Sequence, residues 1–428
     1  MPARRILVAT YYSPPDASVG ANRWAAMTPY LRRLGHEVTV LTTSAFGALA
    51  DDDDVVVRTR DLQASPTLRR LLRRPPLTAP ADGKGGAPSA AAGPPPALLD
   101  RGLVPDAYVA TWLPFAARAA RRLVRERRIE CLITSAPPDS VALLGLLLGR
   151  TRPAWIADFR DGWRFEPLRG AWPTRVQDRV ETRMERRVAT TAEVVIGATR
   201  PIAEDFARRL GANAEHVPNA WDPALDEAVA AADPPTFDPD AITLVHTGQL
   251  SGPRGRDPRP LFEAMHRLAE RRRDARRLRL VLVGGLDASE ERMLAALDVR
   301  AMVQETGQHA RTRALAAQRA ADALLLLTSP GHVSQATGKL YEYLAAGPPI
   351  LALAAGNEAA RIVRETGAGV TVAPDDVGAI EQALERVLDG RLAERARDPA
   401  QLRRYVQPVP AEAVSALVEL AIARRAAS

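Results

Sequence analysis

Cysteine and lysine are nearly missing from this chain of 428 residues. The single cysteine, Cys131, lies in the apolar run 129–133, where a lone cysteine is usually a small core residue. No disulfide can form within the chain, which favours a cytoplasmic location. Of 58 lysines and arginines only two, Lys84 and Lys339, are lysines. A chain that uses arginine almost everywhere thus keeps Lys339 at the start of a predicted helix.

Long hydrophobic runs are absent as well. The longest apolar stretch, residues 141–149, is too short to cross a bilayer. Arg4 and Arg5 are followed by only a short apolar run, so this segment indicates a first strand rather than a signal peptide. We therefore expect a cytoplasmic protein, and any membrane contact is expected to be peripheral, at the inner face.

Several short motifs are also missing. The loop after the first predicted strand has no Gly-x-Gly-x-x-Gly fingerprint, so we expect no dinucleotide cofactor. Zinc-ligand spacings and aromatic–basic RNA motifs are absent, so we expect neither a metal nor a nucleic acid partner. The acidic run 51–54 indicates a solvated turn. The pI near 10.0 fits phosphorylated ligands or an anionic membrane surface.

The length and the order of predicted elements indicate an α/β protein with two domains. At 428 residues, two domains of about 200 residues each are expected. Strands alternate with loops and helices, which is typical of nucleotide-binding folds. We predict a first domain over 1–230, a linker at 233–240, a second domain over 241–405 and a C-terminal helix in 406–428 that packs across both.

Residues 60–105 differ in composition from the rest of the chain. The basic stretch RRLLRRPP precedes a Pro/Gly/Ala-rich stretch without periodicity, which predicts a flexible insert. Its arginines can contact an anionic membrane, or the insert can cover an acceptor. A plain surface loop is the simpler alternative.

The stretch TSPGHVSQATGKLYEYLAAGPPILAL, residues 328–353, predicts a loop, a helix, a turn and a strand. Thr337 can cap the helix with its hydroxyl. Leu340, Tyr343 and Leu344 have the spacing of a packed helix face. Gly347 suits the end of the helix, because the two prolines after it cannot continue it.

The start of this helix is a candidate anion site. Amides near Thr337, Gly338 and Lys339 have no partner inside the helix, and the helix dipole there favours an anion. Lys339 adds a cation, and Glu342 lies one turn further on, where it can accept hydrogen bonds from two hydroxyls. This pattern points to a phosphate with a ribose beside it. The alternative is a strand–helix–strand crossover with a solvated lysine and glutamate.

The segment TGKLYEYLAAGPPILAL resembles the donor-nucleotide segment of retaining GT-B glycosyltransferases of family 4. The resemblance implies two Rossmann-like domains facing a central cleft. It also implies that Glu342 holds the ribose of the donor and that the amides before it hold the diphosphate. Many members have a glutamate eight positions earlier that touches the transferred sugar, and this chain has Ser334 there.

The resemblance extends over most of the chain. The pair TSAPPDS and ADFRDGW is similar to a subgroup that builds bacterial surface glycans or decorates metabolites. In the second domain the family places basic residues facing the diphosphate after the glycine of the first strand. That glycine is Gly248, the next position is Gln249, and Arg254 and Arg256 are the candidates. Gly307 is the candidate for the base.

Two loops of the first domain supply further candidates. Gly20 and Arg23 follow the first strand, where a backbone can approach a ligand closely. Asp158, Arg160 and Asp161 lie at the carboxyl end of a predicted strand, where open α/β sheets bind ligands. A turn glycine and an Asp–Arg pair that closes a turn are the alternatives.

We therefore expect a retaining, metal-independent transfer of a sugar from a nucleotide diphosphate sugar to the hydroxyl of a small-molecule or lipid-linked acceptor, and we expect the donor to be UDP-linked. A sugar-nucleotide epimerase of the same fold and a non-catalytic nucleotide-sugar-binding protein are the rivals. The predicted catalytic residues are Asp158, Asp161, Lys339 and Arg254. The predicted substrate-binding residues are Gly20, Arg23, Gly248, Arg256, Gly307, Ser334, Thr337, Gly338 and Glu342.

Overall fold

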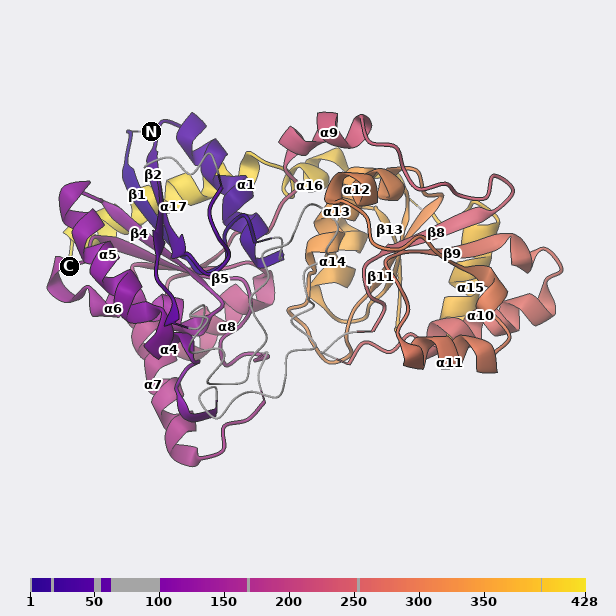
Figure 1. Ribbon diagram of the computed structural model, residues 1–428, viewed down its shortest axis with the longest axis horizontal. Coiled ribbons are helices and arrows are strands. Elements are labelled where there is room, and N and C mark those ends of the chain that lie inside the picture. Colours follow the sequence, from indigo (N-terminus) through magenta and orange to yellow (C-terminus); the bar gives the residue numbers. More distant parts are fainter. Residues whose placement is uncertain are drawn as a thin grey trace. The chain divides into compact units, whose positions relative to one another are not determined.

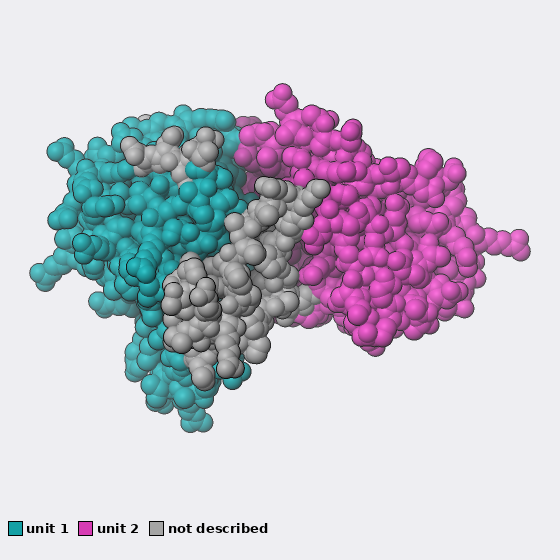
Figure 2. Space-filling model, viewed as in Figure 1, with its two compact units in different colours: residues 1–81, 92–219, 407–428 teal, residues 82–91, 220–406 magenta. Residues whose placement is uncertain are grey.

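The computed structural model describes residues 2–16, 19–49, 55–62, 101–167, 170–251, 255–393 and 395–428. They form two compact units, shown in Figures 1 and 2. The first unit contains the described residues up to Asn219 together with Gln407–Ser428, and the second contains Ala220–Val406. The acidic run 51–54 and most of the predicted insert lie outside the described residues.

The first unit is built on a parallel sheet with the order β3-β2-β1-β4-β5-β6-β7. Strands β1 and β4 are hydrogen-bonded neighbours. Strands β2 and β3 follow on one side of this pair and β5, β6 and β7 on the other, so the strand order reverses between β1 and β4. The strands are β1 Arg5–Thr10, β2 Glu37–Thr43, β3 Val56–Thr59, β4 Cys131–Ala136, β5 Ala154–Phe159, β6 Val194–Gly197 and β7 Ala214–His216.

Helices cover both faces of this sheet. On one face α1 and α17 pack on Ile6, Val8 and Ile133, and on the other α5, α6 and α8 pack on Leu7 and Leu132. The C-terminal helix α17 is therefore part of the first unit, where its Glu419 binds Arg4 at 2.7 and 2.8 Å. The helices are α1 Val19–Arg33, α4 Tyr108–Thr111, α5 Leu113–Glu126, α6 Leu143–Leu147, α7 Arg175–Thr191, α8 Arg200–Leu210 and α17 Val409–Ala426.

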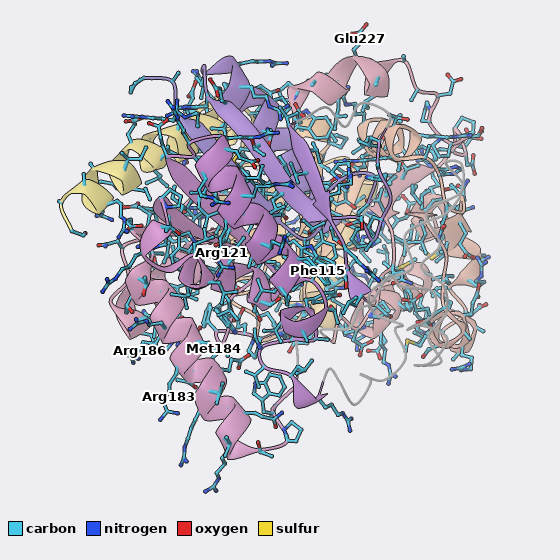
Figure 3. All side chains as sticks on the ribbon, turned by 60° about the vertical axis from the view of Figure 1, so that its left-hand side comes forward. Phe115, Arg121, Arg183, Met184, Arg186 and Glu227 are labelled. Carbon is cyan, nitrogen blue, oxygen red and sulfur yellow. The ribbon has the colours of Figure 1, made fainter. Side chains whose placement is uncertain are left out.

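The highly charged helix α7 shows how such a sequence is accommodated. Arg183 and Arg186 project outward from it, as Figure 3 shows. Glu181 and Glu185 face inward and are fully buried. Glu185 accepts two hydrogen bonds, at 2.7 and 2.8 Å, from Arg209 of α8. Pairing of this kind is what makes a buried carboxylate tolerable.

The second unit has a parallel sheet with the order β10-β9-β8-β11-β12-β13, again reversed beside its first strand. Helices α10, α11 and α15 pack on one face, and α12, α13 and α14 on the other. Its strands are β8 Ile242–Thr247, β9 Leu278–Val283, β10 Val303–Glu305, β11 Ala323–Leu327, β12 Ile350–Leu353 and β13 Gly369–Val372. Its helices are α9 Asp226–Ala230, α10 Arg259–Arg271, α11 Ala288–Ala296, α12 Arg311–Arg319, α13 Gly338–Ala346, α14 Glu358–Glu365, α15 Val377–Leu388 and α16 Pro399–Arg403.

The segment 220–240, which includes the predicted linker, belongs to the second unit. Trp221 and Val229 are buried against Leu315 and Ala316, and the Trp221 amide donates to the carbonyl of Tyr405 at 2.8 Å. These contacts hold the segment on the second unit.

The α/β fold class with two Rossmann-like sheets is confirmed. Strands β1, β5 and β12 lie where the sequence predicts strands. The helical segment before β4 is divided at Trp112 into α4 and α5. Among the described residues, every helix is too short or too polar to span a lipid bilayer.

Candidate functional site

The strand order of the second unit places a candidate site beside β8 and β11. These strands are hydrogen-bonded neighbours, and the chain leaves them toward opposite edges of the sheet. Ligands of open α/β sheets bind outside the carboxyl ends of the strands at such a reversal. Here β8 ends at Thr247 and is followed by Gly248, and β11 ends at Leu327 and leads through a loop to α13.

Gly248 and Lys339 lie in close contact at this point. Gly248 has φ +87°, and a Cβ built on it would lie 3.1 Å from the Nζ of Lys339. The Gly248 amide donates to the carbonyl of Val283 at 2.8 Å, so β9 holds the turn. A side chain at 248 would be strained and would push the ammonium away. The glycine therefore allows Lys339 to lie directly on the backbone that follows β8.

Lys339 is a partly buried cation. Its pKa is lowered to about 8, chiefly by burial and also by the charge of Arg256, while Glu342 opposes the shift. Within the part of the chain that the structure describes, Lys339 forms no ion pair. An anion placed here would interact with a cation that has lost part of its hydration.

The start of α13 adds hydrogen-bond donors. Thr337 is the N-cap residue, as predicted, but its hydroxyl makes no capping bond. That hydroxyl is buried and without a hydrogen-bond partner. The carbonyl of Thr337 accepts from the Leu340 amide at 3.0 Å, so the amides of Gly338 and Lys339 precede the first bond of the helix. Such a hydroxyl and two such amides at one helix start are groups that can donate to an anion.

Arg256 is the second cation near this site. One of its guanidinium nitrogens donates to the Ser251 carbonyl at 2.8 Å, which fixes the side chain on the loop after β8. The effect of Arg256 on the pKa of Lys339 places the two charges near each other. The other predicted arginine, Arg254, lies outside the described residues.

Glu342 is held by two side chains of α12. Arg311 donates to Oε1 and Gln318 to Oε2, each at 3.3 Å. Gln318 is 1% exposed, and its Nε2 also lies 3.2 Å from the hydroxyl oxygen of Thr247 at the end of β8. These two hydrogen bonds orient the carboxylate of Glu342, whose side chain remains 21% exposed. No motif in the sequence marks Gln318 or Arg311 as part of this site.

His246, which the sequence did not indicate as a site residue, connects β8 to β11 through a hydrogen bond. Its Nδ1 lies 2.9 Å from the Leu325 carbonyl and its Nε2 3.1 Å from the Gln249 carbonyl. Burial, reinforced by the charge of Lys339, lowers its pKa to about 3. The imidazole is therefore neutral, and it fixes the loop that carries Gly248.

The remaining candidates of the second unit lie around these groups. Ser334 is buried in the loop before α13, and that loop is anchored because the Glu358 amide donates to the Val333 carbonyl at 2.9 Å. Gly307 is exposed, has φ +77° and follows β10. Strand β10 is two strands from β8, which separates the two strands by about 10 Å across the sheet.

In the first unit, Asp158 and Arg23 form a buried ion pair. Both oxygens of Asp158 accept from Arg23, at 2.9 and 3.2 Å, and its Oδ2 also accepts from Trp24 at 3.0 Å and Ser135 at 2.8 Å. The side chain of Arg23 is 2% exposed and that of Asp158 is 0% exposed. The catalytic role predicted for Asp158 and the substrate contact predicted for Arg23 stay predictions, and within the described residues both groups are satisfied by each other and by their neighbours. The pair joins α1 to β5.

Gly20 and Asp161 lie near a second arginine. Arg160 donates to the carbonyls of Gly20, Ala136 and Pro137. A Cβ on Gly20 would lie 2.9 Å from this guanidinium, so packing inside the unit already accounts for the glycine. Asp161 stays partly exposed at the end of β5. Of the first-unit candidates, Asp161 alone keeps an exposed carboxylate.

No group of three or more histidine, cysteine, aspartate or glutamate side chains able to hold a metal ion occurs among the residues the structure describes. The charges that act on Lys339 are those of Arg256, a cation, and Glu342, a carboxylate.

Two family models match the chain over most of its length. Residues 20–220 match the glycosyl transferase 4-like domain, and residues 241–390 match glycosyl transferases group 1. The chain is a glycosyltransferase of the GT-B type. No curated protein sequence is significantly similar to this glycosyltransferase.

Solved structures share the fold of this glycosyltransferase over nearly the whole chain. A sucrose-phosphate synthase from Thermosynechococcus elongatus is 17% identical with a TM-score of 0.64, and 98% of this chain and 99% of that chain are covered. A UDP-forming trehalose-phosphate synthase from Burkholderia xenovorans, in complex with glucose-6-phosphate, is 13% identical with a TM-score of 0.61, covering 97% and 100%. A proposed UDP-N-acetylglucosamine 2-epimerase from Listeria monocytogenes is 11% identical with a TM-score of 0.54, covering 98% and 96%.

Proposed function

We propose that this glycosyltransferase moves a sugar from a UDP-sugar to an acceptor hydroxyl, with retention of the anomeric configuration. The observation that carries the proposal is the placement of Lys339 and Glu342 one turn apart at the start of α13, beside the carboxyl ends of β8 and β11. In this proposal the second unit binds the donor and the first unit binds the acceptor.

The diphosphate of the donor occupies the anion site in this proposal. The amides of Gly338 and Lys339, the Thr337 hydroxyl and the ammonium of Lys339 all lie at one helix start. Arg256 adds a second cation, and we propose Arg254 as a third cation for the diphosphate. When the bond to the sugar breaks, negative charge grows on the diphosphate, and these fixed donors stabilise it. Because they supply this charge, the proposed reaction needs no divalent ion.

The nucleoside lies along the carboxyl edge of the sheet in this proposal. Glu342, which is oriented by Gln318 and Arg311, accepts hydrogen bonds from the ribose hydroxyls. Gly307, which follows β10 two strands from β8, lies near the base. Ser334 stands where many family 4 members have a glutamate, so the hydroxyl of Ser334 meets the transferred sugar with a weaker, uncharged contact.

The finer assignments are also proposals. We place the chain in the family 4 subgroup that builds surface glycans or decorates metabolites, on the basis of TSAPPDS and ADFRDGW. Asp161 is the proposed residue that orients the acceptor hydroxyl. We propose a cytoplasmic enzyme, and a lipid-linked acceptor would bring it to the inner face of the membrane.

A sugar-nucleotide epimerase is the alternative to a transferase, since the proposed epimerase from Listeria monocytogenes shares this fold. An epimerase would convert the UDP-sugar without any acceptor. A non-catalytic sensor would bind the donor tightly and turn nothing over.

UDP binding tests the proposed donor site. Calorimetry on Glu342→Gln and Lys339→Ala should show a loss of about 10- to 150-fold in UDP affinity, since a charge-assisted hydrogen bond contributes roughly 1.5–3 kcal/mol. Unchanged affinity in both folded variants would refute the site. Free UDP that appears only when an acceptor is added separates transferase from epimerase and sensor.

A further inference from the structure

Aromatic residues are scarce in this chain, at 5% of residues, yet several gather at one place in the first unit. Tyr11 contacts Tyr12, Phe46, Tyr108 and Trp112, with ring centroids 4.4 to 5.8 Å apart. These rings come from the segments after β1 and β2 and from α4 and its C-cap. They therefore lie at the carboxyl edge of the sheet, next to the reversal of strand order between β1 and β4.

The cluster has a buried half and a partly exposed half. Tyr11 and Trp112 are 3% and 0% exposed and act as core residues. Tyr12, Phe46 and Tyr108 remain partly exposed, and the rings of Tyr12 and Phe46 lie 6.0 Å apart at an angle of 31°. Two such tilted rings offer aromatic faces against which the apolar face of a sugar or a planar ring can stack.

Carboxylates surround this aromatic surface. The pKa of the Tyr12 hydroxyl is raised chiefly by burial; the charge of Arg160 lowers it, and the charges of Asp16 and Asp106 raise it, so both carboxylates lie near this ring. Asp61 accepts from the Tyr11 hydroxyl at 2.5 Å. Asp106 accepts from the amides of Tyr108 at 3.0 Å and Ser140 at 2.9 Å, one on each oxygen. Burial raises the pKa of Asp106 to about 6, and its ionised carboxylate favours a hydroxyl or an ammonium as a further donor.

Three of the described arginines at this edge donate hydrogen bonds to oxygen atoms of the protein. Arg160 lies over the Tyr12 ring, 5.8 Å from its centroid, but donates to three carbonyls. Arg58 donates to the Pro14 carbonyl at 2.6 Å, and Arg23 is paired with Asp158. At the start of α13 in the second unit, by contrast, the cation Lys339 has no ion-pair partner among the described residues.

We propose that Tyr12, Phe46 and Tyr108, with Asp16 and Asp106 beside them, bind the ring of the acceptor, and that this acceptor is neutral or positively charged rather than phosphorylated. The inference rests on the proposed transferase function and names its acceptor class. A phosphate dianion would meet carboxylates here, whereas an ammonium gains both a carboxylate and an aromatic face. The Burkholderia xenovorans synthase, with glucose-6-phosphate in its structure, shares the fold but is only 13% identical.

The test compares three probes with one ring and different charge: glucosamine, glucose and glucose 6-phosphate. Saturation-transfer NMR and titration are run on the full chain with UDP bound. Glucosamine and glucose should bind at least about tenfold more tightly than glucose 6-phosphate, because of like-charge repulsion near Asp16 and Asp106. Phe46→Ala should weaken glucose binding, and Asp106→Asn should remove the advantage of glucosamine over glucose.

Phe115→Ala is the matched control, because Phe115 is a partly exposed phenylalanine of α5 in the same unit that forms no ring contact with the cluster (Figure 3). It should leave all three affinities unchanged. The inference is overturned if glucose 6-phosphate binds most tightly, if neither glucose nor glucosamine binds, or if Phe46→Ala and Asp106→Asn both leave binding unchanged. UDP binding is followed in the same samples, and its loss in the wild type would count against the proposed function instead.

Discussion

The ammonium of Lys339 lies against the backbone of Gly248, so close that a Cβ at position 248 would be 3.1 Å from Nζ. This contact joins the turn after β8 to the first turn of α13. It requires both the missing side chain at 248 and a residue with a long cationic side chain at 339.

Gly248→Ala should therefore weaken UDP binding. The new methyl group displaces the ammonium, and at φ +87° it also strains the backbone by about 1–2 kcal/mol. We expect calorimetry to show a loss in affinity of at least about tenfold. Gly390→Ala is the control, since Gly390 has φ +66° and nothing within 4 Å of its Cβ position. If both variants bind UDP like the wild type, the contact has no role in binding.

Gln318 should act on the ribose through Glu342. Its Nε2 bonds both Glu342 and Thr247, so Gln318→Leu frees the carboxylate to rotate. We expect UDP to lose about tenfold in affinity while 2′,3′-dideoxy-UDP, which lacks the ribose hydroxyls, loses little. Glu342→Gln should give the same pattern, and the double variant should lose little more than either single one. An equal loss for both nucleotides would indicate a general structural defect instead.

UDP affinity should fall as the pH rises through about 8. The pKa of Lys339 is lowered to about 8, so above that pH the free protein loses the proton that an anion needs, and affinity should fall about tenfold per pH unit. The neighbouring groups do not titrate in this window, because the pKa of His246 is lowered to about 3 and that of Tyr343 raised to about 12, each chiefly by burial. Titrations between pH 7 and 9.5 measure the slope. Lys339→Ala should bind weakly at every pH, with no slope, and a wild type without a slope would contradict the assignment.

Arg23→Ala should affect stability rather than donor binding. The side chain is 2% exposed and pairs with the fully buried Asp158, and breaking a buried pair typically costs about 3–5 kcal/mol. Urea unfolding should show this loss, whereas Arg183→Ala on the exposed face of α7 should stay within about 0.5 kcal/mol of the wild type. Equal stability of the two variants would contradict a structural role for the Arg23–Asp158 pair and favour the predicted ligand contact.

The region around α13 could be read closely from the sequence. The bounds of α13 and β12 match the prediction, because Thr337 and Gly347 delimit the helix and the prolines after it prevent its extension. The hydroxyl of Thr337 was expected to cap the helix, but it is buried without a partner. Local sequence signals therefore predicted the bounds of α13 correctly, but not the hydrogen bonding of the Thr337 hydroxyl.

The contacts that the sequence does not indicate join distant residues. Asp158 is predicted to face a ligand because it lies near the end of β5, and the structure adds its pairing with Arg23, 135 residues away, inside the first unit. Gln318 contacts partners 24 and 71 residues away, His246 contacts the Leu325 carbonyl 79 residues away, and a lone glutamine or histidine carries no local signal for such a role. Burial and pairing of polar groups decide these cases, and both depend on how the helices pack.

Proton NMR of the product formed in excess EDTA tests the central claim most directly. The account predicts that UDP-sugar is consumed only with an acceptor, that UDP is released, and that the anomeric coupling of the product matches that of the donor. Backbone amides, Lys339 and arginine, rather than a divalent ion, carry the leaving diphosphate in this account. An inverted anomeric coupling, or activity that vanishes in EDTA and returns with magnesium, would contradict it.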